Sequence, residues 1–348
     1  MFETLGDLAG GATTSNASAV SASGDVIVGN SSSDFGGEAF RWTMPGTLAG
    51  LGDLNGGGFN SIANDVSSDG SVIAGVGSAA AGSEAYRWTA DAGTIGLGDL
   101  AGGAFLSVAS GVSGDGSTIV GHSFSSLGLE AFVWTADTGM TGLGDLAGGG
   151  FASFAYDVNA DGSVIVGRGV SASGTEAFRY TTSTGMVGLG DLDGGNFRSE
   201  ALGVSPDGNT IVGTSNSANG DEAFVWTGDT GMVGLGDLAG GSFDSIARAT
   251  NGDIVVGTSS TDLGDEAFIW TQGGGMTRLA DVLTNRFGLD LGDWLLTDAT
   301  GVSADGSVIV GNAIDGLGNT QGFVAIIPNA GTFALLGLAG VSATRRRR

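Results

Sequence analysis

Acidic side chains recur at fixed spacing through this chain, and paired carboxylates can act as the acid and base of glycoside hydrolysis. An aspartate follows Leu-Gly in six tetrapeptides, at Asp7, Asp53, Asp99, Asp145, Asp191 and Asp237. A glutamate opens a Glu-Ala-Phe or Glu-Ala-Tyr triplet at Glu38, Glu84, Glu130, Glu176, Glu222 and Glu266. Catalysis needs one asymmetric constellation, whereas a feature of every copy needs a reason that applies in every copy, such as accepting backbone N–H bonds. We therefore interpret these carboxylates as structural and assign no catalytic residue.

The scarcity of cysteine and histidine excludes several other kinds of site. The chain has no cysteine, which removes disulfides, thiol nucleophiles and thiolate metal ligands. His122 is the only histidine, so a histidine-based triad is nearly excluded, and we interpret it as a surface residue. The segment from Asp157 to Gly162 is the nearest approach to a calcium loop, but it fits a strand and a turn better. We expect no metal and no cofactor.

The repeated acids belong to a unit that recurs every 46 residues, and Leu-Gly-Asp-Leu opens six copies of it. A seventh copy is degraded, because Leu279-Ala280-Asp281 replaces the opening motif and Gln321-Gly322-Phe323 replaces the glutamate triplet. The seventh copy also carries an insertion around residues 286–294. The units begin near residues 5, 51, 97, 143, 189, 235 and 279.

One unit contains enough strand signals for a four-stranded sheet. In the second copy we expect strands over 49–54, 61–67, 71–75 and 84–89, with a tight turn at Asp69-Gly70 because glycine accepts positive φ. Four short strands in each repeat of 40 to 45 residues are typical of a propeller blade. The sequence therefore predicts an all-β, seven-bladed β-propeller over residues 1–327, with a β-solenoid as the alternative.

The surface charge limits the class of partner. The chain has 37 acidic residues against 12 basic ones, all of them arginine, and four of those arginines are its last four residues. Such an anionic body would repel nucleic-acid phosphates, which bind through Lys and Arg. We expect no nucleic-acid partner.

A ligand site on a ring of repeats should lie where the copies differ, since binding requires local asymmetry. The deviating residues that we consider possible ligand contacts are Arg168, Arg248, Arg286 and Trp294, with Tyr156, Arg198, Glu200, Asp290 and Asp293 as further deviants. The alternative explanation is sequence drift in exposed loops.

Residues 328–348 form a tail of a different composition: Pro328, then an apolar stretch, then Arg345, Arg346, Arg347 and Arg348. The apolar stretch is short for a bilayer span, which ordinarily needs about 20 residues. This tripartite order indicates a processing signal with transient membrane contact.

The tail resembles the PEP-CTERM sorting signal, in which a Pro-Glu-Pro-like motif precedes an apolar segment and arginines. The resemblance implies export, recognition by an exosortase and cleavage near the proline, although Pro328-Asn329-Ala330 keeps only the first proline. The body from Leu5 to Phe323 resembles the HAF extracellular repeat family in its Leu-Gly-Asp-Leu-Gly-Gly, Ser-x-Ala and Val-Val-Gly motifs and its final Trp. Glu-Ala-Phe replaces the His-Ala-Phe triplet of that family, and the family brings no biochemical activity with it.

These observations predict an exported, non-enzymatic protein of the cell surface or matrix, acting in protein or polysaccharide contacts. The alternative is an extracellular glycan hydrolase or lyase using asymmetric carboxylates in the seventh unit. Residues 1–4 show no signal-peptide pattern, so we also expect a leader upstream of Met1. Two carboxylates in the axial pocket at glycosidase separation, roughly 5 to 10 Å, would favour the enzyme, and a pocket lined only by equivalent repeat residues would favour the scaffold.

Overall fold

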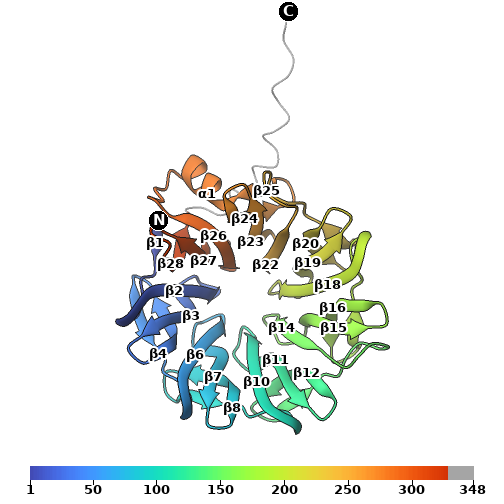
Figure 1. Ribbon diagram of the computed structural model, residues 1–348. Helices are drawn as coiled ribbons and strands as arrows, with labels where there is room; N and C mark the ends of the chain where they lie inside the picture. The colour runs from blue at the N-terminus through green and yellow to red at the C-terminus, as the bar shows by residue number, and fades with distance from the viewer. Residues whose placement is uncertain (328–348) are drawn as a thin grey trace, which may run out of the picture.

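The computed structural model describes residues 1–327, which form seven four-stranded blades around a central axis, with single parallel bridges joining blades 1 and 2 and blades 4 and 5 (Figure 1). The predicted seven-bladed β-propeller is confirmed. Blades 1 to 3 consist of β2 (Gly10–Val20), β3 (Val26–Ser33), β4 (Gly36–Thr43) and β5 (Thr47–Gly50); β6 (Gly56–Val66), β7 (Val72–Ala79), β8 (Gly82–Thr89) and β9 (Gly93–Gly96); and β10 (Gly102–Val112), β11 (Thr118–Ser125), β12 (Gly128–Thr135) and β13 (Gly139–Gly142).

Blades 4 to 6 repeat this order, from the axis outward. They consist of β14 (Phe154–Val158), β15 (Ile165–Ser171), β16 (Gly174–Thr181) and β17 (Gly185–Gly188); β18 (Gly194–Val204), β19 (Thr210–Ser217), β20 (Asp221–Thr227) and β21 (Gly231–Gly234); and β22 (Ser245–Thr250), β23 (Ile254–Thr261), β24 (Gly264–Thr271) and β25 (Gly275–Arg278). Blade 7 consists of β26 (Leu295–Val302), β27 (Val308–Ile314), β28 (Thr320–Ile326) and the N-terminal β1 (Phe2–Thr4).

The Leu-Gly-Asp-Leu motif is not a strand, which corrects the expected strand over 49–54. The outer strand β5 ends at Gly50, and residues 51–54 form the link to the inner strand of the next blade. The reason is local, because Gly52 has a φ of +75°, a left-handed conformation that interrupts extended strand geometry in the middle of the motif. The Asp-Gly turn is confirmed, with Gly70 at a φ of +72° between the inner strand β6 and β7.

The ring closes through both ends of the described chain. Strand β1 pairs antiparallel with β28, so that Glu3 lies opposite Val324, and the Met1 ammonium donates to the Ile326 carbonyl at 2.8 Å. The N-terminal residues thereby supply the outer strand of the last blade (Figure 1). This pairing removes a free edge at the point where the ring would otherwise be open.

The hydrophobic core lies between neighbouring blades. Val26, Ile27 and Val28 of β3 are all 4% exposed or less, as expected for a strand that is covered on both faces. The glycine that ends this motif is required for close packing, because a Cβ at Gly29 would collide with the Asn16 carbonyl of the inner strand. The aromatic residue of each blade's third strand fills the same layer and is fully buried: Phe40, Tyr86, Phe132, Phe178, Phe224, Phe268 and Phe323.

The insertion of the seventh unit lies between blades 6 and 7. It forms α1 (Leu279–Asp281), the π-helical turn η1 (Val282–Arg286) and a loop, with α1 at the outer edge of the ring (Figure 1). Leu283 and Leu291 are buried there against β26 and β28. Within residues 1–327, no helix has the length and apolar character needed to cross a bilayer.

Candidate functional site in the axial channel

The repeated glutamates hold the backbone of the links between blades. Glu38 of blade 1 accepts a hydrogen bond from the Gly52 N–H at 3.1 Å, and Glu84 accepts one from Gly98 at 2.9 Å. Glu130, Glu176 and Glu222 make the equivalent bonds to Gly144, Gly190 and Gly236. The expectation that these side chains accept backbone N–H bonds is confirmed for these five glutamates.

Glu266 departs from this pattern because its link has changed. Arg278 stands at the end of β25, where the outer strands of blades 1 to 5 end in glycine, and its Nε lies 3.1 Å from the Glu266 carboxylate. The Thr261 hydroxyl donates to the same carboxylate at 2.6 Å.

A serine at the start of each Ser-x-Ala motif joins consecutive blades. The Ser61 hydroxyl donates to the Gly52 carbonyl at 2.6 Å and accepts from the Ala39 N–H of blade 1 at 3.0 Å. Asp53 completes the link by accepting from the Leu54 and Asn60 N–H groups, both at 2.7 Å. The Glu, Ser and Asp side chains of the three repeat motifs therefore form one set of hydrogen bonds that joins neighbouring blades, and we call this set the staple.

Each inner strand carries a β-bulge that faces the axis. The pairing of β6 with β7 shifts register between Ala63 and Asp65, and the other six inner strands shift at the same place. Bulges re-aim side chains and are common at the rims of barrels. These bulges direct a ring of side chains into an axial channel with a volume of about 460 Å³.

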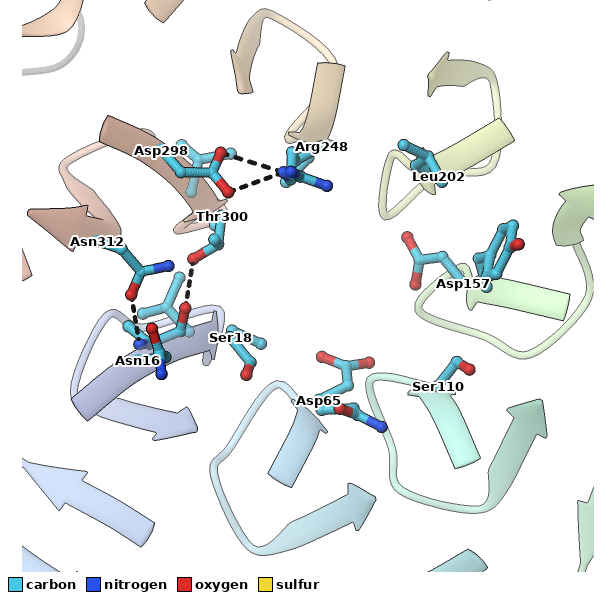
Figure 2. Close-up of a pocket in the computed structure, with 18 residues that line it drawn as sticks. Asn16, Ser18, Asp65, Ser110, Asp157, Leu202, Arg248, Asp298, Thr300 and Asn312 are labelled. Carbon is cyan, nitrogen blue, oxygen red and sulfur yellow. Dashed lines mark hydrogen bonds and ion pairs between the residues drawn. The ribbon is translucent and has the colours of Figure 1, made fainter. Parts of the chain in front are cut away.

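The ring differs in nearly every blade. One repeat position lines the channel in all seven blades, and its occupants are Ser18, Asn64, Ser110, Tyr156, Leu202, Arg248 and Thr300. Figure 2 shows labelled side chains from all seven blades around the open centre. The repeats therefore differ at a position that lines the channel.

Two carboxylates face the channel from the next repeat position. Asp65 accepts from the Val66 N–H and, across the blade boundary, from the Val112 N–H, both at 2.8 Å. Asp157 makes the same pair of bonds to Val158 at 2.7 Å and to Val204 at 2.8 Å. In the other blades this position holds Ala19, Gly111, Gly203, Ala249 and Gly301.

The pKa values of both carboxyl groups are raised. Burial is the main cause at each, and it outweighs the two backbone N–H bonds that favour the ionised form. The charge of Asp157 raises the pKa of Asp65 further, so the two groups resist ionising together. The channel therefore holds two carboxyl groups, in blades 2 and 4, that keep their protons to higher pH than an ordinary aspartate does.

The opposite side of the channel holds an ion pair. Arg248 of blade 6 places its Nε 2.9 Å from the Asp298 carboxylate of blade 7. Burial raises the pKa of Asp298, and the Arg248 charge opposes that rise. Thr300 donates to the Ala17 carbonyl, and Asn312 accepts from the Ala17 N–H, which joins blade 7 to blade 1 (Figure 2).

The structure brings some of the predicted contact residues to the channel and places others elsewhere. Tyr156 and Arg248 line it. Arg168 lies beside it, stacked 4.6 Å from the Phe154 ring and 3.4 Å from Glu200. Arg198 continues this chain of ion pairs, with contacts of 3.2 Å to both Glu200 and Asp221.

Arg286 and Trp294 belong to the insertion and do not line the channel. Trp294 packs against the core between blades 6 and 7, and Asp290 accepts a hydrogen bond from Gly292 within its own turn. Asp293 belongs to the same insertion. In the seventh unit, Asp298 is the carboxylate that reaches the channel, and it is paired with Arg248.

The expectation that His122 lies on the surface is wrong. Its ring packs 4.9 Å from the Phe154 ring of the next blade, and its buried Nδ1 has no hydrogen-bond partner within residues 1–327. Burial lowers the pKa of His122 to about 4, and the nearby Arg168 contributes. The residue after Val-Gly faces the neighbouring blade, so it is not a free loop position.

Sequence reasoning missed Asp65 and Asp157 as channel residues. The pattern around Asp157 fits a strand and a turn, and Asp65 falls on the strand expected over 61–67. The usable signal is that only two of seven copies carry an acid at this position. Within the described part of the chain, no cluster of three or more possible ligands could hold a metal ion.

Comparisons with known proteins identify the fold. No protein-family model and no curated protein matches the chain. Among solved structures, TolB from Acinetobacter baumannii has 12% identity and a TM-score of 0.50 over 75% of this chain and 61% of its own. A structure from a study of two prolyl endopeptidases has 12% identity and a TM-score of 0.56 over 91% of this chain and 51% of its own. The chain thus spans about half to three fifths of these proteins, and the likeness shows a β-propeller fold alone.

Proposed function

We propose that the protein is an exported, non-enzymatic binding scaffold of the cell surface or matrix, acting in protein or polysaccharide contacts through its axial channel. The observation that carries this proposal is the division of roles among its polar residues. The repeated Glu and Ser side chains are occupied by backbone bonds between blades, as Glu38 and Ser61 show. The variable positions converge on one polar channel. A rigid ring that presents an asymmetric concave site is suited to recognition.

The proposed location rests on composition and on the tail. The chain lacks cysteine and lysine and carries a formal net charge of −25. Pro328 and the arginines Arg345, Arg346, Arg347 and Arg348, which resemble an exosortase signal, lie outside the described residues. Processing by an exosortase-type enzyme, with transient membrane contact, belongs to the same proposal.

A glycan array probed with the labelled full chain tests this proposal. We expect binding to a subset of glycans, and Arg248→Ala should weaken it by about tenfold or more, since hydrogen bonds to charged groups contribute about 1.5–3 kcal/mol. Asp290→Ala, in the insertion outside the channel, is the matched control and should bind normally. Binding that is indifferent to the channel variant would contradict the assignment of the site.

One observation favours a second function, that of a glycan hydrolase or lyase. Two carboxyl groups with raised pKa values, Asp65 and Asp157, share the channel. A protonated carboxylic acid beside an ionised one is the arrangement that acid–base glycoside cleavage uses. These residues lie in blades 2 and 4, in contrast to the seventh unit that the sequence suggested. Release of reducing ends from a bound glycan, abolished in Asp65→Asn and in Asp157→Asn, would establish this function.

A further inference from the structure

Two grooves lie side by side at the boundaries of blades 1, 2 and 3, away from the axial channel. The first has a volume of about 610 Å³ and the second about 480 Å³. The first is lined by Arg41 of β4, residues 69–72 of the turn between β6 and β7, and residues 87–91 of β8 and its following turn. The second is lined by Arg87, Gly116, Ser117 and residues 134–137.

The second groove is the repeat equivalent of the first. Each takes an arginine from one blade, a Gly-Ser turn from the next, and a Trp-Thr-Ala-Asp segment from the third strand and turn of that next blade. Arg87 stands 46 residues after Arg41, and Trp134 stands 46 residues after Trp88. Arg87 lines both grooves and so connects them.

The arginines of these grooves are available to a ligand. Neither Arg41 nor Arg87 forms an ion pair with any of residues 1–327, although the chain carries 37 acidic residues. The Arg41 Nε is buried without a hydrogen-bond partner in that range, and its Nη1 makes one long bond of 3.4 Å to Thr43. Buried donors of this kind are costly unless something accepts from them.

Aromatic and acceptor groups complete each groove. Trp88 and Trp134 are half-buried, whereas the equivalent Trp42 of blade 1 is 1% exposed. Asp91 and Asp137, at the ends of the same segments, are exposed. Each groove therefore combines an aromatic side chain with a planar guanidinium, a carboxylate and a serine.

We propose that these two grooves together bind one chain of a neutral polysaccharide. An indole face packs against the C–H groups of a sugar ring, while guanidinium and carboxylate groups donate to and accept from its hydroxyls. The strong negative charge of the body opposes a polyanionic polymer. Two copies of one site suit a polymer that repeats, because engaging the second site after the first is intramolecular.

This inference rests on the proposed binding function and deepens it by naming a ligand class and a second surface. The other blades vary at the groove positions. At the boundary of blades 3 and 4, Val133 stands at the arginine position and Tyr180 at the tryptophan position. At the boundary of blades 5 and 6, Val225 stands at the arginine position and Trp270 at the tryptophan position, so both boundaries lack the arginine. Arg179 and Trp226 restore the pair at the boundary of blades 4 and 5.

Affinity gel electrophoresis of the full chain tests the inference, with dextran, laminarin or galactomannan in the gel and alginate as the acidic polymer. At least one neutral polymer should retard the protein. Arg87→Ala should weaken that binding by about tenfold or more, because one side chain serves both grooves. Trp88→Ala should weaken it as well, and Trp88→Phe should retain part of it.

The matched controls occupy the same repeat positions where the arginine–tryptophan pair is absent. Val133→Ala and Trp270→Ala should bind as the wild type does, and thermal melting should show each variant folded. Retardation that persists in Arg87→Ala, retardation by alginate alone, or none by any neutral polymer would each overturn the inference. The channel variant Arg248→Ala separates the two proposals, since it should leave groove binding intact.

Discussion

The carboxylate of Glu38 accepts a hydrogen bond from the backbone N–H of Gly52, 3.1 Å away, and thereby fixes the link between blades 1 and 2. This pair explains why two motifs that lie 14 residues apart recur together through the chain. Gly52 adopts a φ of +75° so that its N–H faces Glu38 while its carbonyl faces Ser61. The repeated sequence is a device for joining blades.

Replacing Gly52 with alanine should destabilise the protein by about 1–2 kcal/mol, the cost of a left-handed conformation for an L-residue. A Cβ at Gly52 would have open space around it, so the effect isolates backbone conformation from steric overlap. Gly58→Ala is the control, because Gly58 also has open space and its φ is not positive. Urea denaturation provides the comparison, and equal losses in the two variants would contradict the explanation.

The contribution of the staple to stability can be tested by removing its serine hydroxyl. Ser107→Ala removes the donor to the Gly98 carbonyl and the acceptor for the Ala85 N–H, leaving two backbone groups without this partner. We expect a loss of about 1–3 kcal/mol in the free energy of unfolding, the cost of unsatisfied buried groups. Ser126→Ala, in an exposed loop, should change it little. A loss no larger than that of the control would show that the staple adds no stability.

The sequence predicts the repeated part of this fold well and the site poorly, for one physical reason. Repetition reveals features that every blade needs, such as Gly29 against the Asn16 carbonyl or the buried Phe40. It conceals the φ of Gly52, because two leucines in a short motif resemble a strand in sequence, whereas the glycine between them has a left-handed conformation in the structure. For this reason the expected position of one strand in each unit was wrong by several residues, whereas the predicted number of blades was correct.

The channel is harder to predict because it combines one or two residues from every blade. Asp65 and Asp157 are about two repeats apart in sequence, yet the ring turns both toward the axis. The bulge that exposes them is an irregularity of pairing, and period-two alternation gives no sign of it. Deviating residues such as Arg286 and Trp294 are equally good candidates in the sequence, and only the fold shows that the insertion that carries them lies away from the channel.

The pair formed by Arg248 and Asp298 should contribute modestly to stability. The Arg248 side chain is 38% exposed and that of Asp298 is 20% exposed, so solvent screens the interaction. A double-mutant cycle with Arg248→Ala and Asp298→Ala should give a coupling energy of about 1 kcal/mol at low salt, decreasing as salt is added. Additive effects of the two substitutions would show that the contact links blades 6 and 7 without stabilising them.

The channel carboxylates should make stability depend on pH. Burial raises the pKa of Asp65 and of Asp157 above the ordinary value of 3.8, so the folded protein holds these protons more tightly than the unfolded chain. This contribution is fully present below pH 3.8 and is lost as the pH rises through the raised folded values. The wild type should therefore lose stability from acidic toward neutral pH relative to a variant without these acids.

The double variant Asp65→Ala/Asp157→Ala provides that comparison, because blades 1 and 6 already carry alanine at the same repeat position, as Ala19 and Ala249. The difference in free energy of unfolding between the two proteins should change by about 1 kcal/mol or more between pH 4 and pH 7, since one unit of pKa shift corresponds to about 1.4 kcal/mol. Asp69→Ala, at an exposed turn where hydrogen bonds from Ser71 lower the pKa, should remove a contribution of the opposite kind, one that is present above pH 3.8 and is lost as the pH falls below it. Parallel pH profiles for the wild type and the double variant would show that the channel acids ionise as freely in the folded protein as in the unfolded chain.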